Sequence, residues 1–241
     1  MSRIIKISII ILLAVICVGT LFIAYQYTQA AQGTDDKVNL IKGNQTILLL
    51  TVDPSEKRPG LGAVDMAFKL DIVNGSLKGY EPIYPGGMSH PTASPPQELS
   101  KYNSKLMLHD TLWSNNTEEG VQLARETIEY NTDIKTDATV IITPAAVDAM
   151  IAAIGPIYIE GKGQVSGNSI EFLREEQKAG MNRAEAVESL MKPIYETLKD
   201  KNKRMVLYKV AIEQYLQGNI VVLPKSLVMD FAVQNGLIYL L

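Results

Sequence analysis

Two aspartates and an arginine lie close together in the sequence and could bind a cation or a phosphate. Asp53 follows an apolar run at residues 47–51, and Asp65 precedes a second apolar run at residues 66–73. Arg58 lies between them, in a stretch that prolines and glycines break into a loop. A strand that ends in a carboxylate can pair with a strand that begins with one, so both carboxylates can meet at one sheet edge. This pattern predicts a binding site for a hard cation or a phosphate. Acids at strand ends are also typical of turns, which is the alternative interpretation.

Composition and short motifs exclude several classes of function. The net charge of −3 gives no basic surface for nucleic acid, so no nucleic-acid partner is expected. Cys17 is the only cysteine, which excludes an intrachain disulfide and a cysteine-rich zinc site. Gly60 and Gly62 lack the third glycine of a dinucleotide-binding motif. The Ser89-His90 pair lacks the glycine-flanked serine of the hydrolase elbow.

An apolar segment near the start of the sequence is long enough to cross a membrane. Residues 7–25 carry no charge, and a helix of this length spans roughly 28 Å. A cleaved signal peptide is the alternative, because small residues at 28–31 could form a cleavage site. The apolar run exceeds the usual length in a signal peptide, which favours an uncleaved transmembrane signal anchor at residues 7–27.

Basic residues before this segment predict its orientation. Arg3 and Lys6 place residues 1–6 in the cytoplasm as a short tail. Residues 28–43 are then a polar stalk, and residues 44–241 form an extracytoplasmic domain. The expected location is therefore the cell membrane, with a single span and the C-terminal domain outside.

The remaining sequence alternates strands with helices. The Asn74-Gly75 pair between two apolar runs predicts a hairpin, with a third strand at residues 77–81. Residues 82–104 contain five prolines and predict a long irregular loop. Thr117, Thr143 and Asn182 are each expected to cap a helix. Residues 145–154 are apolar nearly all round, which predicts a buried helix. Further strands are expected at residues 138–143, 157–160 and 220–223, with helices at residues 166–177, after Asn182, and at residues 203–217 and 225–234. This alternation predicts an α/β fold, a layered mixed sheet with helices on both sides.

Three stretches together resemble the LytR–CpsA–Psr phosphotransferases, which build bacterial cell envelopes. The first comprises LLLTVD, the arginine-bearing loop and AVDMAF, at residues 48–68. The second is ATVIITPAAVDAMIAAIGPIYIEG at residues 138–161, and the third is SGNSIEFLREEQKAGMNRAEAVESLM at residues 166–191. A closer resemblance is to a branch of membrane-anchored proteins of unknown function from archaea and bacteria. The chain is identified as a member of that branch and as a distant relative of the phosphotransferases.

The resemblance implies a specific chemistry. The family's enzymes move a glycopolymer phosphate from a polyprenyl-diphosphate carrier to a wall acceptor outside the membrane. Carried over to this sequence, Asp53 and Asp65 would hold Mg²⁺. Arg174 and Arg183 would bind the diphosphate of the lipid-linked glycan and take part in catalysis, with Arg58 as a further catalytic candidate. Magnesium prefers carboxylate oxygen, and arginine matches phosphate oxygens in shape and charge.

Departures from the family pattern leave two functions open. The family's Ser-Ile-Pro-Arg-Asp motif is replaced by YEPIYPGG at residues 80–87, and Arg174 is followed by Glu175 and Glu176. Both arginines of the third stretch could instead pair with neighbouring glutamates on exposed helix faces. One function is a magnesium-dependent phosphotransferase or pyrophosphatase acting on lipid-linked glycopolymer. The other is a non-catalytic envelope protein that binds a glycan, a lipid head group or a protein partner.

Overall fold

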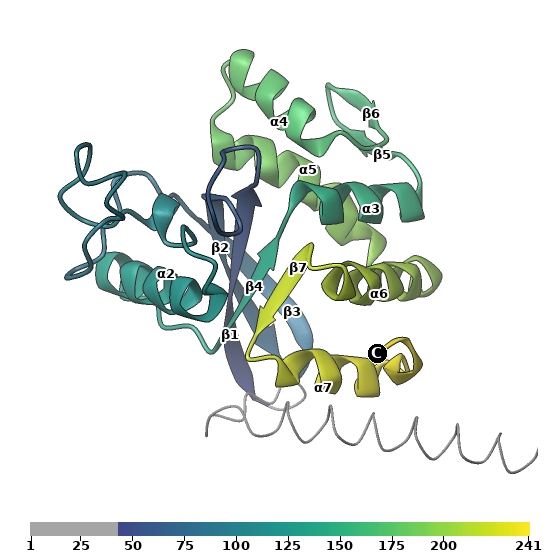
Figure 1. The fold of residues 1–241 in the computed structure, drawn as a ribbon. Helices are drawn as coiled ribbons and strands as arrows, with labels where there is room; N and C mark the ends of the chain where they lie inside the picture. Colours follow the sequence, from purple (N-terminus) through teal and green to yellow (C-terminus); the bar gives the residue numbers. More distant parts are fainter. Residues whose placement is uncertain (1–42) are drawn as a thin grey trace, which may run out of the picture.

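A five-stranded mixed sheet forms the centre of the domain, with helices on both faces (Figure 1). The computed structural model describes residues 43–241, apart from the side chains of Arg183 and Ala184. The elements in chain order are β1 (Asn44–Asp53), β2 (Ala63–Val73), β3 (Ser76–Ile83), the 3-10 helix η1 (Leu108–Asp110), α2 (Thr117–Thr132), β4 (Ala138–Ile142), α3 (Pro144–Ile154), β5 (Ile157–Ile159), β6 (Gly163–Val165), α4 (Ser169–Lys178), α5 (Arg183–Thr197), α6 (Lys201–Leu216), β7 (Ile220–Leu223), α7 (Ser226–Gln234) and η2 (Ile238–Leu240). The strand order in the sheet is β3-β2-β1-β4-β7, which confirms the predicted mixed α/β architecture.

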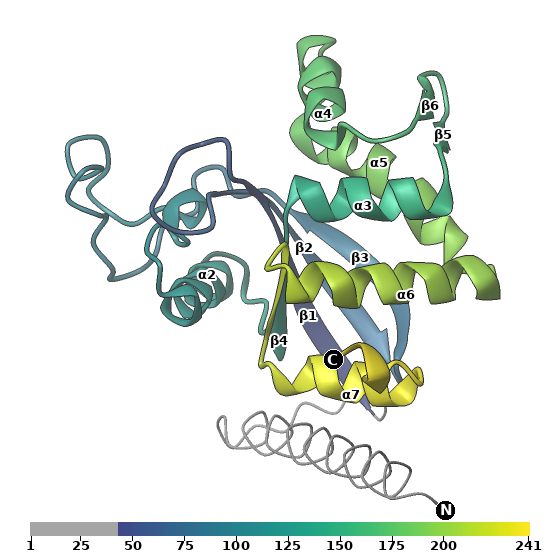
Figure 2. The ribbon, with the colours of Figure 1, turned by 45° about the vertical axis from the view of Figure 1, so that its right-hand side comes forward.

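Strand β1 lies in the middle of the sheet because its side chains are apolar on both faces. It pairs antiparallel with β2 and parallel with β4. Leu48 and Leu50 are fully buried in a cluster with residues of α2, whereas Leu49 packs in a cluster with residues of α3 and α6. Figure 2 shows α2 on one side of the sheet and α3, α6 and α7 on the other. A continuous apolar run is typical of a strand that is covered on both faces.

Strand β2 begins earlier than the sequence predicted. It starts at Ala63, opposite Asp53, so that Asp65 lies within the strand rather than before it. The register shifts between Thr51 and Val52, and Asp65 is the additional residue of a β-bulge. The bulge adds one residue without turning the apolar residues that follow onto the wrong face of the sheet.

Several predicted turns and caps are confirmed. Asn74 and Gly75 have positive φ angles of 50° and 74°, as the two central residues of a tight hairpin turn require. The Thr143 side chain caps α3, and Asn182 forms a capping box with Glu185 at the start of α5. These short-range signals depend only on neighbouring residues, which is why the sequence reveals them.

Two helix starts differ from the prediction. Helix α2 is capped by Asn116, whose side chain accepts a backbone N–H three residues further on, so Thr117 is the first helical residue and not the cap. Helix α4 begins three residues later than expected, at Ser169. Gly167 and Asn168 have φ angles of 144° and 55°, which a right-handed helix cannot include.

Helix α3 is more exposed than predicted, and the strand that follows it lies outside the central sheet. Val147 and Ile151 are buried against the sheet, but Ala152 and Ala153 are exposed, so the helix is apolar without being buried all round. Alanine suits both environments because its side chain is small. Strand β5 pairs only with β6 among the described strands, and the two form a separate hairpin outside the central sheet.

The predicted cytoplasmic tail, transmembrane anchor and nearly all of the stalk fall outside the described residues. Among residues 43–241, no helix combines the length and the apolar character that a membrane span needs.

Candidate functional site

Asp53 is the last residue of the central strand β1. It lies at the edge of the sheet that is formed by strand ends, not at an outer strand. Its side chain is 10% exposed, and its Oδ1 accepts the backbone N–H of Ser55 at 2.8 Å. This local bond is the turn that an aspartate before proline favours, and it fixes the carboxylate. The register places Asp53 opposite Ala63, two residues from Asp65 on the neighbouring strand. The backbone therefore brings both predicted metal ligands to the same end of the β1–β2 pair.

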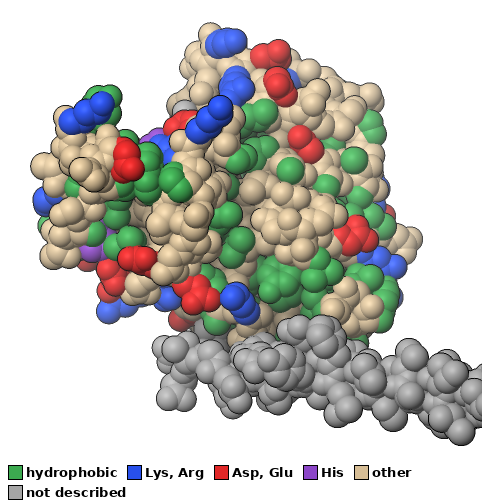
Figure 3. All heavy atoms as spheres, in the orientation of Figure 1, with side chains coloured by type: hydrophobic (Ala, Val, Ile, Leu, Met, Phe, Trp, Pro, Cys, Tyr) green, Lys and Arg blue, Asp and Glu red, His purple; other side chains and the backbone are tan. Residues whose placement is uncertain are grey.

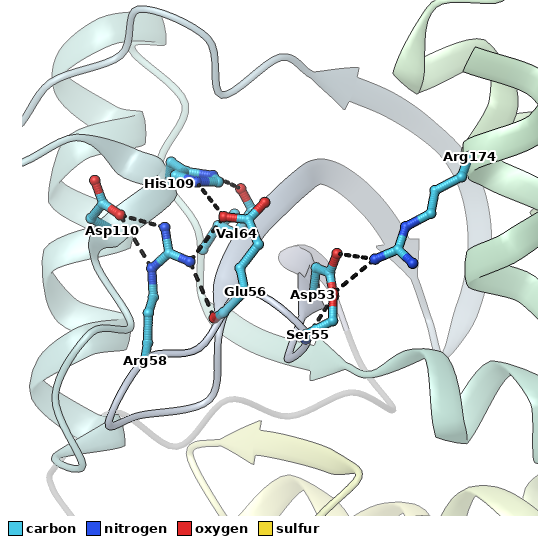
Figure 4. A network of polar contacts seen from close by, with 8 residues as sticks. All are labelled: Asp53, Ser55, Glu56, Arg58, Val64, His109, Asp110 and Arg174. Atoms are coloured by element: carbon cyan, nitrogen blue, oxygen red, sulfur yellow. Dashed lines mark hydrogen bonds and ion pairs between the residues drawn. The ribbon is translucent and has the colours of Figure 1, made fainter. Parts of the chain in front are cut away.

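Arg174 reaches this edge from helix α4, as Figure 4 shows. Its Nη2 donates to Ser55 Oγ at 2.8 Å and lies 3.6 Å from Asp53 Oδ2. The second distance is too long for a hydrogen bond, so the attraction to the carboxylate is electrostatic. A predicted phosphate-binding arginine and a predicted metal-binding acid, far apart in sequence, thus lie together.

The guanidinium of Arg174 keeps most of its hydrogen-bonding capacity. The bond to Ser55 is its one hydrogen bond to the described residues, and the side chain is 50% exposed. Arginine carries several N–H donors in a planar fork that fits phosphate or carboxylate oxygens. Figure 3 shows charged side chains of both signs gathered around α4. An anion can therefore approach Arg174 from solvent without first breaking a buried network.

Arg58 lies in a different environment. Its side chain is 8% exposed, and its Nε and Nη2 donate to Asp110 Oδ1 at 3.2 and 2.7 Å. Its Nη1 donates to Glu56 Oε2 at 3.0 Å, and its guanidinium carbon lies 5.7 Å from the centre of the Trp113 ring. All three nitrogens are engaged, and none of these contacts involves Asp53 or Arg174. Arg58 therefore fixes the path of the loop, while its catalytic role stays a prediction.

Two glycines explain why the loop after β1 can take this path. A Cβ at Gly60 would lie 2.3 Å from the carbonyl oxygens of Leu112 and Ser114, so only glycine allows this approach. The Gly60 N–H also donates to Trp113 O at 2.8 Å. Gly62 has a φ angle of 113°, which residues with a side chain rarely adopt. The loop is therefore attached to the segment that carries the partners of Arg58.

Several residues of this network were not predicted as functional. Ser55 contacts both Asp53 and Arg174, and the Asp-Pro-Ser turn is the signal that could have revealed it. His109 places Nδ1 3.1 Å from Val64 O and Nε2 3.2 Å from Glu56 Oε2. No local sequence signal pairs these residues, because their contacts join segments some 45 to 53 positions apart.

Comparison with known proteins supports the resemblance that the sequence suggested. Residues 42–177, more than half of the chain, match the family model described as "Protein of unknown function (DUF4012)". The chain belongs to this family. No curated protein matches its sequence.

Solved structures show which fold this DUF4012 chain shares. Protein gbs0355 from Streptococcus agalactiae is 16% identical, with a TM-score of 0.53 over 86% of this chain and 77% of that one. A Bacillus subtilis protein described as the transcriptional regulator yvhJ is 14% identical, with a TM-score of 0.51 over 82% and 77%. B. subtilis TagV is 15% identical, with a TM-score of 0.46 over 81% and 80%. The two likenesses with a TM-score above 0.5 show a shared fold, and the family match confirms the predicted branch of unknown function.

The DUF4012 edge can supply part of the shell of a magnesium ion, which water and a phosphate would complete. The described residues contain no group of three or more acidic, histidine or cysteine side chains that could hold a metal by themselves. Asp53 Oδ2 accepts no hydrogen bond from the described residues, so this oxygen can coordinate a cation. Magnesium commonly takes one or two carboxylates and completes its shell with phosphate oxygens and water. Asp53, with Asp65 nearby on the backbone, matches that pattern, and Mg²⁺ stays a prediction.

Two further charged residues of the third stretch, Arg183 and Glu176, differ in what the structure reveals. Arg183 is the first residue of α5, which packs beside α4, but its side chain lies outside the described part. Glu176 is buried, and its Oε2 lies 2.7 Å from Lys162 Nζ in the turn between β5 and β6. The negative charge of Glu176 is therefore compensated there and opposes a phosphate at Arg174 less than the sequence suggested.

Proposed function

We propose that the DUF4012 chain binds the diphosphate of a lipid-linked glycopolymer at the Asp53–Arg174 edge. With Mg²⁺, it breaks the phosphoanhydride bond, so that the glycopolymer phosphate passes to an acceptor hydroxyl or to water and polyprenyl phosphate leaves. The observation that carries the proposal is the 3.6 Å approach of Arg174 Nη2 to Asp53 Oδ2. A partly exposed arginine, with one hydrogen bond to the described residues, lies beside a fixed carboxylate whose Oδ2 accepts no hydrogen bond from them. Phosphoryl transfer depends mainly on neutralising and positioning phosphate charge, which this pair of groups can supply.

The proposed substrate requires that the edge can reach the membrane. We propose that residues 7–27 anchor the chain in the membrane and that the domain lies outside the cytoplasm. Strand β1 separates its start, near Gly43, from Asp53 by roughly 30 Å. The stalk at residues 28–43 could extend to roughly 55 Å, so the domain can turn its far edge towards the lipid surface. Protease added to cells without a wall should digest the domain, and a protected domain would contradict this topology.

A non-catalytic binding function is the second candidate. It is favoured by the engagement of Arg58, which leaves Arg174 as the one arginine with described side-chain contacts at Asp53. The proposed chemistry would normally use several cations around a diphosphate. With fewer cations, the same edge could hold a lipid or glycan phosphate without transferring it.

Binding and turnover of a polyprenyl diphosphate distinguish the two candidates. The full chain in detergent would be titrated with farnesyl diphosphate in the presence of MgCl₂. Formation of polyprenyl phosphate, the product of both transfer and hydrolysis, would be followed with a glycan linked to polyprenyl diphosphate. Replacing Arg174 by Ala should lower affinity roughly 10- to 150-fold, because a charge-assisted hydrogen bond is lost. Lys178→Ala removes the same charge from the exposed end of α4 and should change little. Arg183→Ala should weaken binding in the same way as Arg174→Ala.

The outcomes separate clearly. Binding together with polyprenyl phosphate formation that depends on Arg174 and Mg²⁺ supports the enzyme. Binding that depends on Arg174 without formation of this product supports the second candidate. Equal binding by the parent, Arg174→Ala and Lys178→Ala proteins would place the phosphate elsewhere, and both candidates would fail at this edge.

A further inference from the structure

The Arg174 guanidinium lies beside the Asp53 oxygen that a bound cation would need. A magnesium ion coordinates a carboxylate oxygen at about 2.1 Å. Asp53 Oδ2, the oxygen that accepts no hydrogen bond from the described residues, has the Arg174 guanidinium 3.6 Å away. A divalent cation on that oxygen would lie beside a positive group of like charge. The arginine and the metal therefore compete for the same carboxylate oxygen.

The contacts of the Arg174 side chain are weak enough for it to move away from Asp53. One hydrogen bond, to Ser55 Oγ at 2.8 Å, joins its guanidinium to the described residues, and half of its side chain is exposed. Exposed ion pairs contribute little to stability because water screens them. Asp53, in contrast, is held by the backbone N–H of Ser55 at 2.8 Å and is 10% exposed. The carboxylate is the fixed partner of this pair, and the arginine is the movable one.

We propose that Arg174 neutralises Asp53 in the ligand-free protein and turns to a phosphate group when one binds, which opens Asp53 to Mg²⁺. The inference rests on the proposed function for the phosphate ligand, but it adds an order of events. Mg²⁺ binds weakly while Arg174 covers Asp53, and more tightly once a phosphate has drawn the arginine away. By linkage, Mg²⁺ favours phosphate binding by the same factor. The site therefore takes up the metal with its substrate instead of holding it permanently.

Calorimetric titrations of the full chain in detergent test this coupling. MgCl₂ would be titrated into the parent protein with and without saturating inorganic phosphate, and then into Arg174→Ala without phosphate. Without phosphate, Arg174→Ala should bind Mg²⁺ about 5- to 150-fold more tightly than the parent, the usual range of such couplings. The same variant should bind phosphate more weakly. Opposite changes for cation and anion are the signature, since a variant that merely distorts the edge would weaken both.

Three further variants test whether the gain in Mg²⁺ affinity comes from removing the charge of Arg174 beside Asp53. Lys178→Ala, with the same loss of charge on the same helix, should leave Mg²⁺ affinity unchanged within a factor of two. Arg174→Gln removes the charge but keeps an amide that can still donate to Ser55, and should also tighten Mg²⁺ binding. Adding Asp53→Asn to Arg174→Ala should abolish the gain, because the coordinating oxygen is lost.

Each outcome decides the proposal. Unchanged or weaker Mg²⁺ binding by both Arg174 variants would overturn it, as would an equal gain in Lys178→Ala. Absence of Mg²⁺ binding in the parent and in both Arg174 variants would also overturn it. A gain in Mg²⁺ affinity in a protein that binds neither phosphate nor farnesyl diphosphate would support the competition at Asp53 while refuting the proposed function.

Discussion

Arg58 and Arg174 lie at the same end of the sheet, but their ion pairs differ in burial and in the number of hydrogen bonds (Figure 4). Arg58 and its partner Asp110 are 8% and 7% exposed, and all three nitrogens of Arg58 have acceptors. Arg174 is 50% exposed and makes one hydrogen bond to the described residues. A buried, saturated pair has no capacity left for a ligand, whereas an open pair has capacity and contributes little stability. Charge alone therefore does not identify a ligand-binding arginine.

The difference follows from the elements that carry the two side chains. Arg58 belongs to a loop that Gly60 brings into contact with the backbone of residues 112–114, so its side chain is enclosed beside Trp113. Arg174 lies on the outer face of a helix whose opposite face carries the buried Glu176. The loop gives a fixed guanidinium and the helix gives one that can turn.

The largest expected effect comes from breaking the saturated pair. Arg58→Ala leaves Asp110 buried without its partner, so the free energy of unfolding should fall by about 3–5 kcal/mol. Urea unfolding followed by circular dichroism measures this change. Arg58→Met combined with Asp110→Leu should recover most of the loss, because an apolar pair of similar volume needs no compensation of charge. A loss below about 1 kcal/mol for Arg58→Ala would mean that the pair is not saturated and buried.

The attachment of the loop gives the second test. Gly60→Ala places a Cβ against two carbonyl oxygens, and we expect a loss of about 1–3 kcal/mol because backbone atoms must shift. Gly86→Ala is the matched control, since nothing lies within 4 Å of a Cβ there, and its effect should stay within about 0.5 kcal/mol. The same urea unfolding measures both. Equal effects of the two variants would contradict the close approach of the loop.

The hydrogen bond between His90 and Glu126 is intermediate in exposure between the two arginine pairs, and its contribution to stability should also be intermediate. His90 is buried, and its Nδ1 accepts the backbone N–H groups of Thr92 and Ala93, so Nε2 carries the proton and donates to Glu126 at 2.8 Å. Hydrogen bonds from Gln122 and then from His90 lower the pKa of Glu126 below its ordinary value of 4.5. The stabilisation is therefore complete above the unfolded pKa and is lost as the pH falls through the lower folded pKa.

Chemical unfolding at two pH values measures this contribution. At pH 7, Glu126→Gln should be less stable than the parent by at most about 1 kcal/mol, because the Glu126 side chain is 44% exposed. The difference should shrink as the pH falls below 4.5, the ordinary pKa of a glutamate, and vanish once the Glu126 carboxyl of the parent is neutral as well. A difference that persists unchanged in acid would show that packing, and not the charge of Glu126, stabilises the contact.

Local signals account for most of the fold that the sequence predicted. The apolar run of β1, the Asn74-Gly75 turn and the cap at Thr143 each act within a few residues, and each is confirmed. The bulge that takes Asp65 into β2 was missed, because it depends on the register with β1. The late start of α4 was missed because Gly167 and Asn168 were included in the helix, although glycine and asparagine readily adopt a positive φ.

The candidate site was predictable only in part for the same reason. Asp53 and Arg174 were proposed from separate stretches, and the structure brings them together. Asp110 was not proposed, since its role arises from Arg58, 52 positions away. The sequence shows which residue types are present. It does not show that Arg58 is enclosed by its loop while Arg174 stays accessible to a ligand, because that depends on contacts between distant segments.

The smallest expected effect completes the comparison between the two pairs. Arg174→Ala should change the free energy of unfolding by only about 0.5 kcal/mol, because its ion pair with Asp53 is long and half of its side chain is exposed. Asp53 keeps the backbone N–H of Ser55 and gains water where the guanidinium lay. Urea unfolding should place Arg174→Ala beside Lys178→Ala and far from Arg58→Ala. A loss of 3 kcal/mol or more, as estimated for a buried pair, would mean that Arg174 is a structural residue like Arg58 and is not free to turn to a phosphate.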